Sequence, residues 1–170
     1  RKRLVFDEFF MFLVGVRRLK ESREGKKTEF VIRPGEETGR LKESLPYALT
    51  SAQERTLQEV FSDLQKGCVM NRLVQGDVGS GIAILALLAA AENGYQGALM
   101  VPTEVLARQH FESITKMFET SGIDKKVVLI TGSMTAKEKR IAYEKTASHG
   151  ADIIVGTHAL IQEKVVYDKL

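Results

Sequence analysis

Short apolar runs alternate with longer amphipathic segments along most of this 170-residue chain. Four mostly apolar runs are expected to form strands, over residues 71–75, 98–101, 127–130 and 153–156. Helices are expected over residues 51–66, 82–93, 105–120 and 135–148. Apolar strands that are separated by single helices form a parallel sheet with helices on both faces. The pattern therefore predicts a three-layer α/β fold with a mostly parallel sheet.

The first 44 residues differ from this pattern. Residues 3–24 are expected to form a long helix that precedes the sheet, with apolar side chains around so much of its surface that it needs cover on most sides. Residues 25–44 are polar, are interrupted by Gly25, Pro34, Gly35 and Gly39, and hold one short strand-like run at 30–32. We therefore expect a helix over 1–24, a linker over 25–44 and one globular unit over 45–170.

Composition narrows the class of protein. With 44% apolar and 28% charged residues, the chain has the make-up of a soluble globular domain. Its longest apolar stretch, residues 81–91, is too short to cross a bilayer, and no signal peptide is visible. The single cysteine, Cys68, is expected to be a buried structural thiol in a reducing compartment, so we predict a cytoplasmic location. Because the chain begins at Arg1, we expect it to be a piece of a longer protein.

Positive charge gathers at the N-terminal end. Residues 1–27 hold nine Lys or Arg against four Asp or Glu, whereas the rest of the chain holds 16 against 18. A basic arm on a near-neutral body is compatible with contacts to phosphate groups. A solvated helix face would give the same pattern, so charge alone leaves both interpretations open.

A glycine-rich loop lies between an expected strand and an expected helix. Gly76 and Gly81 enclose Asp77, Val78, Gly79 and Ser80. In a phosphate-binding loop such glycines let backbone N–H groups converge on phosphate oxygens, and the helix that follows points its positive end at the same place. A simple glycine turn between strand and helix is the alternative.

The two residues after this loop depart from the full motif. A phosphate-binding loop continues with a lysine, which reaches the β- and γ-phosphates, and with a Ser or Thr, whose hydroxyl binds magnesium. Here these positions hold Ile82 and Ala83, which have neither a positive charge nor a metal ligand. We expect ATP binding to be weakened by about two orders of magnitude or more, and hydrolysis to be affected further.

Five blocks in order resemble the RecG family of bacterial branch-migration helicases, which belong to superfamily 2. They are LPYALTSAQ (45–53), MNRLVQGDVGSG (70–81), VPTEVLARQH (101–110), TGS (131–133) and IVGTHAL (154–160). The transcription-repair coupling factor shares the general pattern but usually matches less well at GDVGSG and GTHAL. The resemblance extends over about residues 45–164, and residues 1–24 are similar to the helix that precedes the motor in that family.

The resemblance implies a RecA-like P-loop NTPase lobe, the first of two in an ATP-dependent DNA helicase that remodels stalled forks and Holliday junctions in repair and recombination. It implies ATP and Mg²⁺ as cofactors, branched and single-stranded DNA as partners, and a monomer without membrane attachment. The nucleotide site would comprise Gln53, which matches the family's adenine-reading glutamine, Gly76, Asp77, Val78, Gly79, Ser80, Gly81, Ile82 and Ala83. Gln53 also stands at the spacing of a capping box with Thr50, and both roles can hold.

Three threonines follow expected strands. The resemblance assigns DNA-backbone contacts to Pro102 and Thr103, and we extend this prediction to Thr131, Gly132, Thr157 and His158, which stand at equivalent strand ends. Ligands of parallel sheets lie at the carboxyl ends of the strands, where hydroxyls and helix N-termini can meet phosphates. Each threonine could instead only cap the next helix.

The chain also lacks family features. The Asp-Glu motif that binds magnesium, the second motor lobe and the DNA-wedge domain are not present in its 170 residues. No residue is assigned a catalytic or metal-binding role, and we predict that this chain is inactive by itself. A nucleic-acid-binding module without ATP use and a structural α/β domain are the alternatives.

Overall fold

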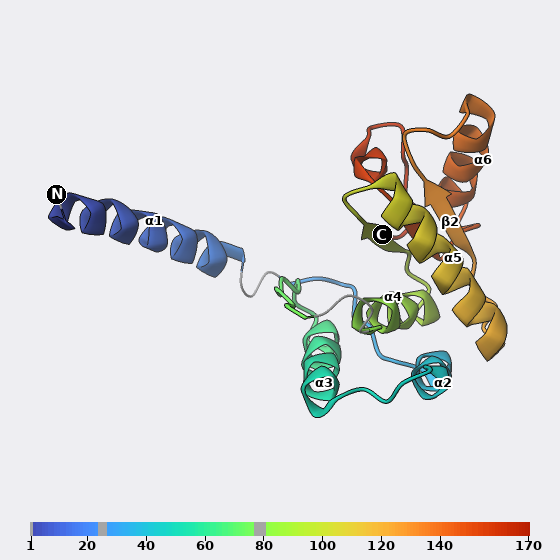
Figure 1. Ribbon diagram of the computed structural model, residues 1–170, viewed down its shortest axis with the longest axis horizontal. Helices are drawn as coiled ribbons and strands as arrows, with labels where there is room; N and C mark the ends of the chain where they lie inside the picture. The colour runs from blue at the N-terminus through green and yellow to red at the C-terminus, as the bar shows by residue number, and fades with distance from the viewer. Residues whose placement is uncertain (1, 24–26, 77–80) are drawn as a thin grey trace.

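The computed structural model describes residues 2–23, 27–76 and 81–170. Its elements, in chain order, are α1 (Lys2–Arg23), α2 (Glu36–Ser44), α3 (Ser51–Gln65), α4 (Ile82–Glu92), β1 (Gly97–Met100), α5 (Glu104–Ser121), β2 (Val127–Ile130), α6 (Ala136–Ala147), β3 (Ile153–Gly156) and the 3₁₀ helix η1 (His158–Ile161). Figure 1 shows α1 as a rod that stands away from the other elements.

The sheet has three described strands in the order β1-β3-β2, and both pairings are parallel. Met100 and Ile130 both lie opposite Gly156, so the three strands end level with one another. A Cβ atom at Gly156 would lie 2.1 Å from the carbonyl oxygen of Ile130, which means that only glycine fits at this point. The predicted parallel sheet is confirmed for three of its four expected strands.

Side chains of β3 point alternately into two cores. Ile153 and Val155 are fully buried on the face covered by α4 and α5, together with the buried helix residues Leu85, Leu88 and Ile114. Ile154 is fully buried on the opposite face, against α6 and η1. A strand that is apolar on both faces therefore lies between two helical layers, and the predicted three-layer fold is confirmed.

Local hydrogen bonds fix where three helices begin. Capping boxes form at the starts of two helices, between Thr50 and Gln53 in α3 and between Thr135 and Glu138 in α6. The Thr103 hydroxyl caps α5. Each box satisfies two backbone N–H groups that the first turn of a helix leaves without a partner. These caps use only neighbouring residues, which is why the sequence predicts the helix starts to within one residue.

The predicted strand at 71–75 is absent, and Leu73 within it is 94% exposed. The strand-like run at 30–32 of the predicted linker forms no strand either. Ile32 instead donates its backbone N–H to the Leu64 carbonyl at 3.1 Å, at the end of α3. An apolar run can predict a strand, but it does not say whether a neighbouring strand offers hydrogen-bond partners.

Residues 36–44 of the predicted linker 25–44 form helix α2, with Thr38 and Leu41 buried. Its start is capped from a distance. The Glu92 carboxylate, at the end of α4, accepts backbone N–H groups from Gly35 (2.9 Å), Glu37 (2.7 Å) and Thr38 (3.2 Å), together with the Thr38 hydroxyl. This partner lies more than 50 residues away, so no local signal could have identified it.

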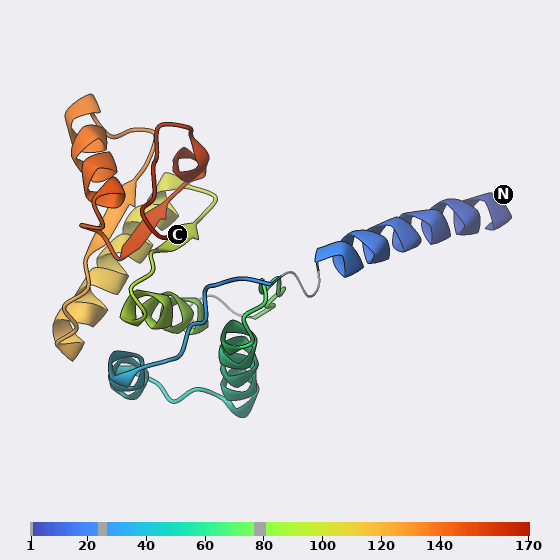
Figure 2. The ribbon, with the colours of Figure 1, turned by 180° about the vertical axis from the view of Figure 1, so that it is seen from behind.

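Helix α1 leaves most of its described apolar side chains uncovered. Figures 1 and 2 show it apart from the sheet from both sides. Eight of its large apolar side chains are roughly half to two-thirds exposed: Val5, Phe6, Phe9, Phe10, Met11, Phe12, Leu13 and Val16. Within the described part of the chain, no helix is both long and apolar enough to cross a membrane.

The Glu92 cap generates a stability prediction. Glu92→Gln replaces a carboxylate with a neutral amide, one end of which cannot accept an N–H. We expect the free energy of unfolding to fall by about 1–2 kcal/mol, measured by urea denaturation. Glu112→Gln, an equal charge change at an exposed position of α5, should stay within about 0.5 kcal/mol of the parent chain. Equal effects of both changes would contradict the cap.

Candidate nucleotide and nucleic-acid site

The carboxyl ends of the three strands form one edge of the sheet. Because Met100, Gly156 and Ile130 are in register, the segments after β1, β3 and β2 start side by side. The Val101 N–H donates to the Gly156 carbonyl at 2.8 Å, which continues the pairing one residue beyond β1. The predicted DNA-contacting residues therefore follow three adjacent strands, in the spatial order 102–103, 157–158 and 131–132.

Pro102 and Thr103 are exposed at the start of α5. The Thr103 hydroxyl oxygen accepts the Leu106 N–H at 3.3 Å, so the capping role is confirmed. The cap leaves the hydroxyl proton free to donate, since a hydroxyl can accept and donate at the same time. Capping and phosphate contact are thus compatible at Thr103.

Thr131 and Thr157 differ in exposure and in bonding. Thr131 is fully buried, so its side chain does not reach the surface, and exposed Gly132 follows it. Thr157 is half-buried before η1, and its side chain makes no capping hydrogen bond. His158 is exposed at the first position of η1. Thr103 and Thr157 are the two threonines of this edge that solvent reaches, and of these Thr157 is the one whose hydroxyl caps no helix.

A polar cluster after β2 escaped the sequence interpretation. The Glu104 carboxylate, in the first turn of α5, accepts the Ser133 N–H at 3.0 Å and also the Ser133 hydroxyl. Arg108 donates to the same hydroxyl at 3.4 Å, and Lys139 donates to the Gly132 carbonyl at 2.6 Å. The Ser133 hydroxyl, and then its N–H and the Arg108 charge, lower the pKa of Glu104 against the effect of burial, so this carboxylate is ionised at neutral pH.

Only the ends of the glycine loop can be placed. Asp77, Val78, Gly79 and Ser80 lie outside the described residues, while Gly76 is exposed. Gly81 has φ +72°, a left-handed conformation that favours glycine, and it stands immediately before α4. The α4 N-terminus therefore opens toward the loop and offers the positive end of its dipole there.

Ile82 and Ala83 do not fit the roles that ATP and Mg²⁺ require. Ile82 is 6% exposed and belongs to the core that contains Leu41, Leu57 and Leu85. Ala83 is exposed and carries no oxygen ligand. The position that should extend a positive charge toward phosphate instead fills the apolar core, and the Ala83 side chain beside it has no oxygen that could bind magnesium.

Gln53, the predicted adenine reader, is engaged in the capping box. Its side-chain oxygen accepts the Thr50 N–H at 2.8 Å, and the side chain is half-buried. This confirms the structural role of Gln53. The adenine contact stays a prediction, because it requires the side-chain amide to reach a nucleotide while the cap persists or opens.

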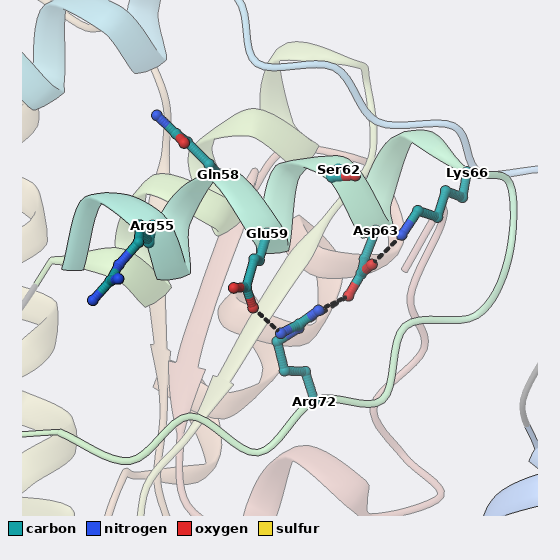
Figure 3. A pocket seen from close by; sticks show the side chains of 7 residues that line it. All are labelled: Arg55, Gln58, Glu59, Ser62, Asp63, Lys66 and Arg72. Carbon is teal, nitrogen blue, oxygen red and sulfur yellow. Dashed lines mark hydrogen bonds and ion pairs between the residues drawn. The ribbon is translucent and has the colours of Figure 1, made fainter. Parts of the chain in front are cut away.

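A hollow lined by charged side chains lies on α3, and Arg72, from the segment before the glycine loop, is bound in it by ion pairs. Figure 3 shows Arg72 between Glu59 and Asp63, with Lys66 on the other side of Asp63. Hydrogen bonds from Lys66 and then Arg72 lower the pKa of Asp63. These ion pairs tie residue 72 to the outside of α3, which gives a physical reason why residues 71–75 do not join the sheet. The lining holds three cationic side chains, Arg55, Lys66 and Arg72, against the carboxylates of Glu59 and Asp63, so its ion pairs offset most but not all of its charge.

Comparison with known sequences places the chain among helicases. The family profile of DEAD/DEAH box helicases matches residues 50–169. The ATP-dependent DNA helicase RecG of Streptococcus pneumoniae is 47% identical over 99% of this chain, and RecG of Bacillus subtilis is 44% identical over 100%. In both cases the chain spans 25% of the relative's length.

Solved structures agree with the sequence comparison. RecG bound to a three-way DNA junction is 36% identical and has a TM-score of 0.81, over 100% of this chain and 24% of that one. A hypothetical ATP-dependent RNA helicase from Sulfolobus tokodaii is 22% identical with a TM-score of 0.51, over 72% of this chain and 34% of that one. The second likeness concerns the fold alone.

The burial of Ile82 predicts the cost of restoring a lysine. Ile82→Lys should lower the free energy of unfolding by about 2 kcal/mol or more, because an apolar side chain leaves the core and the ammonium group must reach water. Ala83→Thr, next to it but exposed, should change stability by no more than about 0.5 kcal/mol. Thermal or urea unfolding measures both. An Ile82→Lys chain as stable as the parent would contradict the core role of this residue.

Proposed function

Because the chain belongs to the DEAD/DEAH box helicase family, we propose that it is part of the first motor lobe of an ATP-dependent DNA helicase of the RecG type. The match to RecG relatives over nearly the whole chain supports this assignment. The helicase activity belongs to a longer protein, since the chain spans about a quarter of these relatives. The role of this segment in that protein is to hold DNA and to frame the nucleotide site.

One observation carries the DNA-binding role, namely the level ending of three parallel strands. Their alignment brings Thr103 and Thr157 to one edge, together with the exposed turn at Gly132. Hydroxyls and backbone N–H groups at such an edge suit the oxygens of a phosphate backbone, and contacts of this kind position a protein without reading sequence. Branched DNA is the proposed substrate of the whole protein, in the remodelling of forks and Holliday junctions, and the junction-bound RecG structure supports that choice.

By itself, this chain is not expected to use ATP. Ile82 lies in the core and Ala83 offers no ligand, so the chain by itself is expected neither to bind ATP with Mg²⁺ tightly nor to hydrolyse it. This favours a second candidate function, a DNA-binding module that does not use ATP. The two candidate functions differ in whether a lysine at position 82 and a threonine at position 83 would restore ATP binding.

The first experiment measures ATP binding. Isothermal titration with ATP and Mg²⁺ should show weak or no binding by this chain, and an affinity about a hundredfold higher for Ile82→Lys with Ala83→Thr. Ala83→Thr alone is the control, and circular dichroism must first establish that the double variant is folded. If a folded double variant gains nothing, the phosphate-cradle interpretation of residues 76–83 is wrong.

The second experiment measures DNA binding by fluorescence anisotropy with a single-stranded oligonucleotide at several salt concentrations. Affinity should fall steeply as salt rises, since each phosphate contact releases counterions. Thr157→Val, which removes a hydroxyl and keeps the shape, should weaken binding about tenfold. Thr120→Val, at the far end of α5, is the matched control. Salt-independent affinity, or equal effects of the two variants, would reject the proposed edge.

A further inference from the structure

The backbone N–H and the hydroxyl of Ser133 both donate to the Glu104 carboxylate instead of to solvent. Glu104 accepts both the backbone N–H and the hydroxyl of Ser133, one with each oxygen. The two partners are 29 residues apart and come from different segments, the first turn of α5 and the turn that follows β2. A negatively charged oxygen pair thus already occupies two aligned donors on the proposed DNA-binding edge.

Positive groups surround the same point. Arg108, one turn further along α5, donates to the Ser133 hydroxyl, and Lys139 in α6 donates to the adjacent Gly132 carbonyl. The other carboxylate close by, Glu138, accepts the N–H and the hydroxyl of Thr135, both at 2.8 Å, as part of its own helix cap. Among the described residues, Glu104 is therefore the anion that faces the Ser133 donors.

A backbone phosphate has the same requirements as this carboxylate. Both present two oxygens that share negative charge, and both bind strongly to N–H, hydroxyl and guanidinium donors. Ser133 comes two residues after Thr131, so the donors lie where β2 ends, beside the ends of β3 and β1. Exposed Ser133 and Arg108 are accessible from solvent.

We propose that Ser133, Arg108 and Lys139 form a phosphate site on this edge, and that the Glu104 carboxylate occupies the site until a DNA phosphate displaces it. The inference rests on the proposed DNA-binding function and adds to it a competitor carried by the chain itself. Glu104 lowers the affinity for DNA and keeps the Ser133 turn in its bound shape while DNA is absent. If Glu104 only fastened the turn to α5, its loss would disorder the Ser133 donors and would therefore weaken DNA binding.

The first arm of the test uses the 170-residue chain and a single-stranded oligothymidylate. Glu104→Gln keeps the size of the side chain but removes its charge, and it should bind DNA about fivefold tighter than the parent. The salt dependence should steepen by about 0.7 in log–log slope, which corresponds to one more phosphate contact. Glu112→Gln, on the same helix and with the same charge change, should gain less than about twofold.

The second arm uses inorganic phosphate and needs no DNA binding. In ¹⁵N-labelled protein, the Ser133 amide resonance of Glu104→Gln should shift on addition of phosphate, while that of the parent should respond at least fivefold more weakly. Adding Ser133→Ala to Glu104→Gln should abolish the gain in DNA affinity. This arm separates two failures, since a phosphate response without DNA binding would reject the proposed function and retain the anion site.

One result would support the proposed phosphate site, and three others would overturn it. A gain specific to Glu104→Gln, lost again with Ser133→Ala, supports it. An equal gain from Glu112→Gln would assign the effect to net charge and overturn it. Weaker DNA binding by Glu104→Gln would assign the carboxylate a fastening role, and an unchanged Ser133 resonance in phosphate would overturn the anion site whatever DNA does.

Discussion

The parallel pairing of β3 with β1 and β2 is the constraint on which the other features depend. Strand β3 is buried on both faces and supplies Ile153 and Val155 to one core and Ile154 to the other. Its last residue, Gly156, lies so close to the Ile130 carbonyl that no side chain fits. Both cores and the shared level of the strand ends therefore follow from one strand.

That edge brings together residues that are distant in the chain. Helix α5 starts there. Thr103, the residue before its first turn, caps the helix, and the Glu104 carboxylate in that turn holds the turn after β2. Helix α4 points its N-terminus toward the glycine loop and caps α2 at its other end through Glu92. Helix α4 thus links the residues next to the glycine loop with the packing of α2, so a change at one end of this helix is expected to influence the other.

Features with a local cause could be predicted from the sequence. Thr50 with Gln53 predicts the start of α3, and the apolar runs at 127–130 and 153–156 predict strands at their observed positions. Features that depend on a partner remote in the chain could not. The run at 71–75 lacked a neighbour in the sheet, with Arg72 bound to α3 instead, and α2 depends on a carboxylate from another helix. In the site, buried Thr131 and the pair of Glu104 with Ser133 were invisible because burial and pairing arise only in three dimensions.

The burial of Ile82 has a consequence for any attempt to restore the phosphate loop. The full motif requires a lysine at this position, whereas the core of this chain is filled there by an isoleucine, so the two demands compete. A single change to lysine would lower stability before any nucleotide affinity could compensate for it. Ala83 would still lack the hydroxyl, so this first step brings a cost and only part of the benefit. Compensating substitutions elsewhere in the core would have to accompany the lysine, so the loop and the packing beneath it would have to be redesigned together.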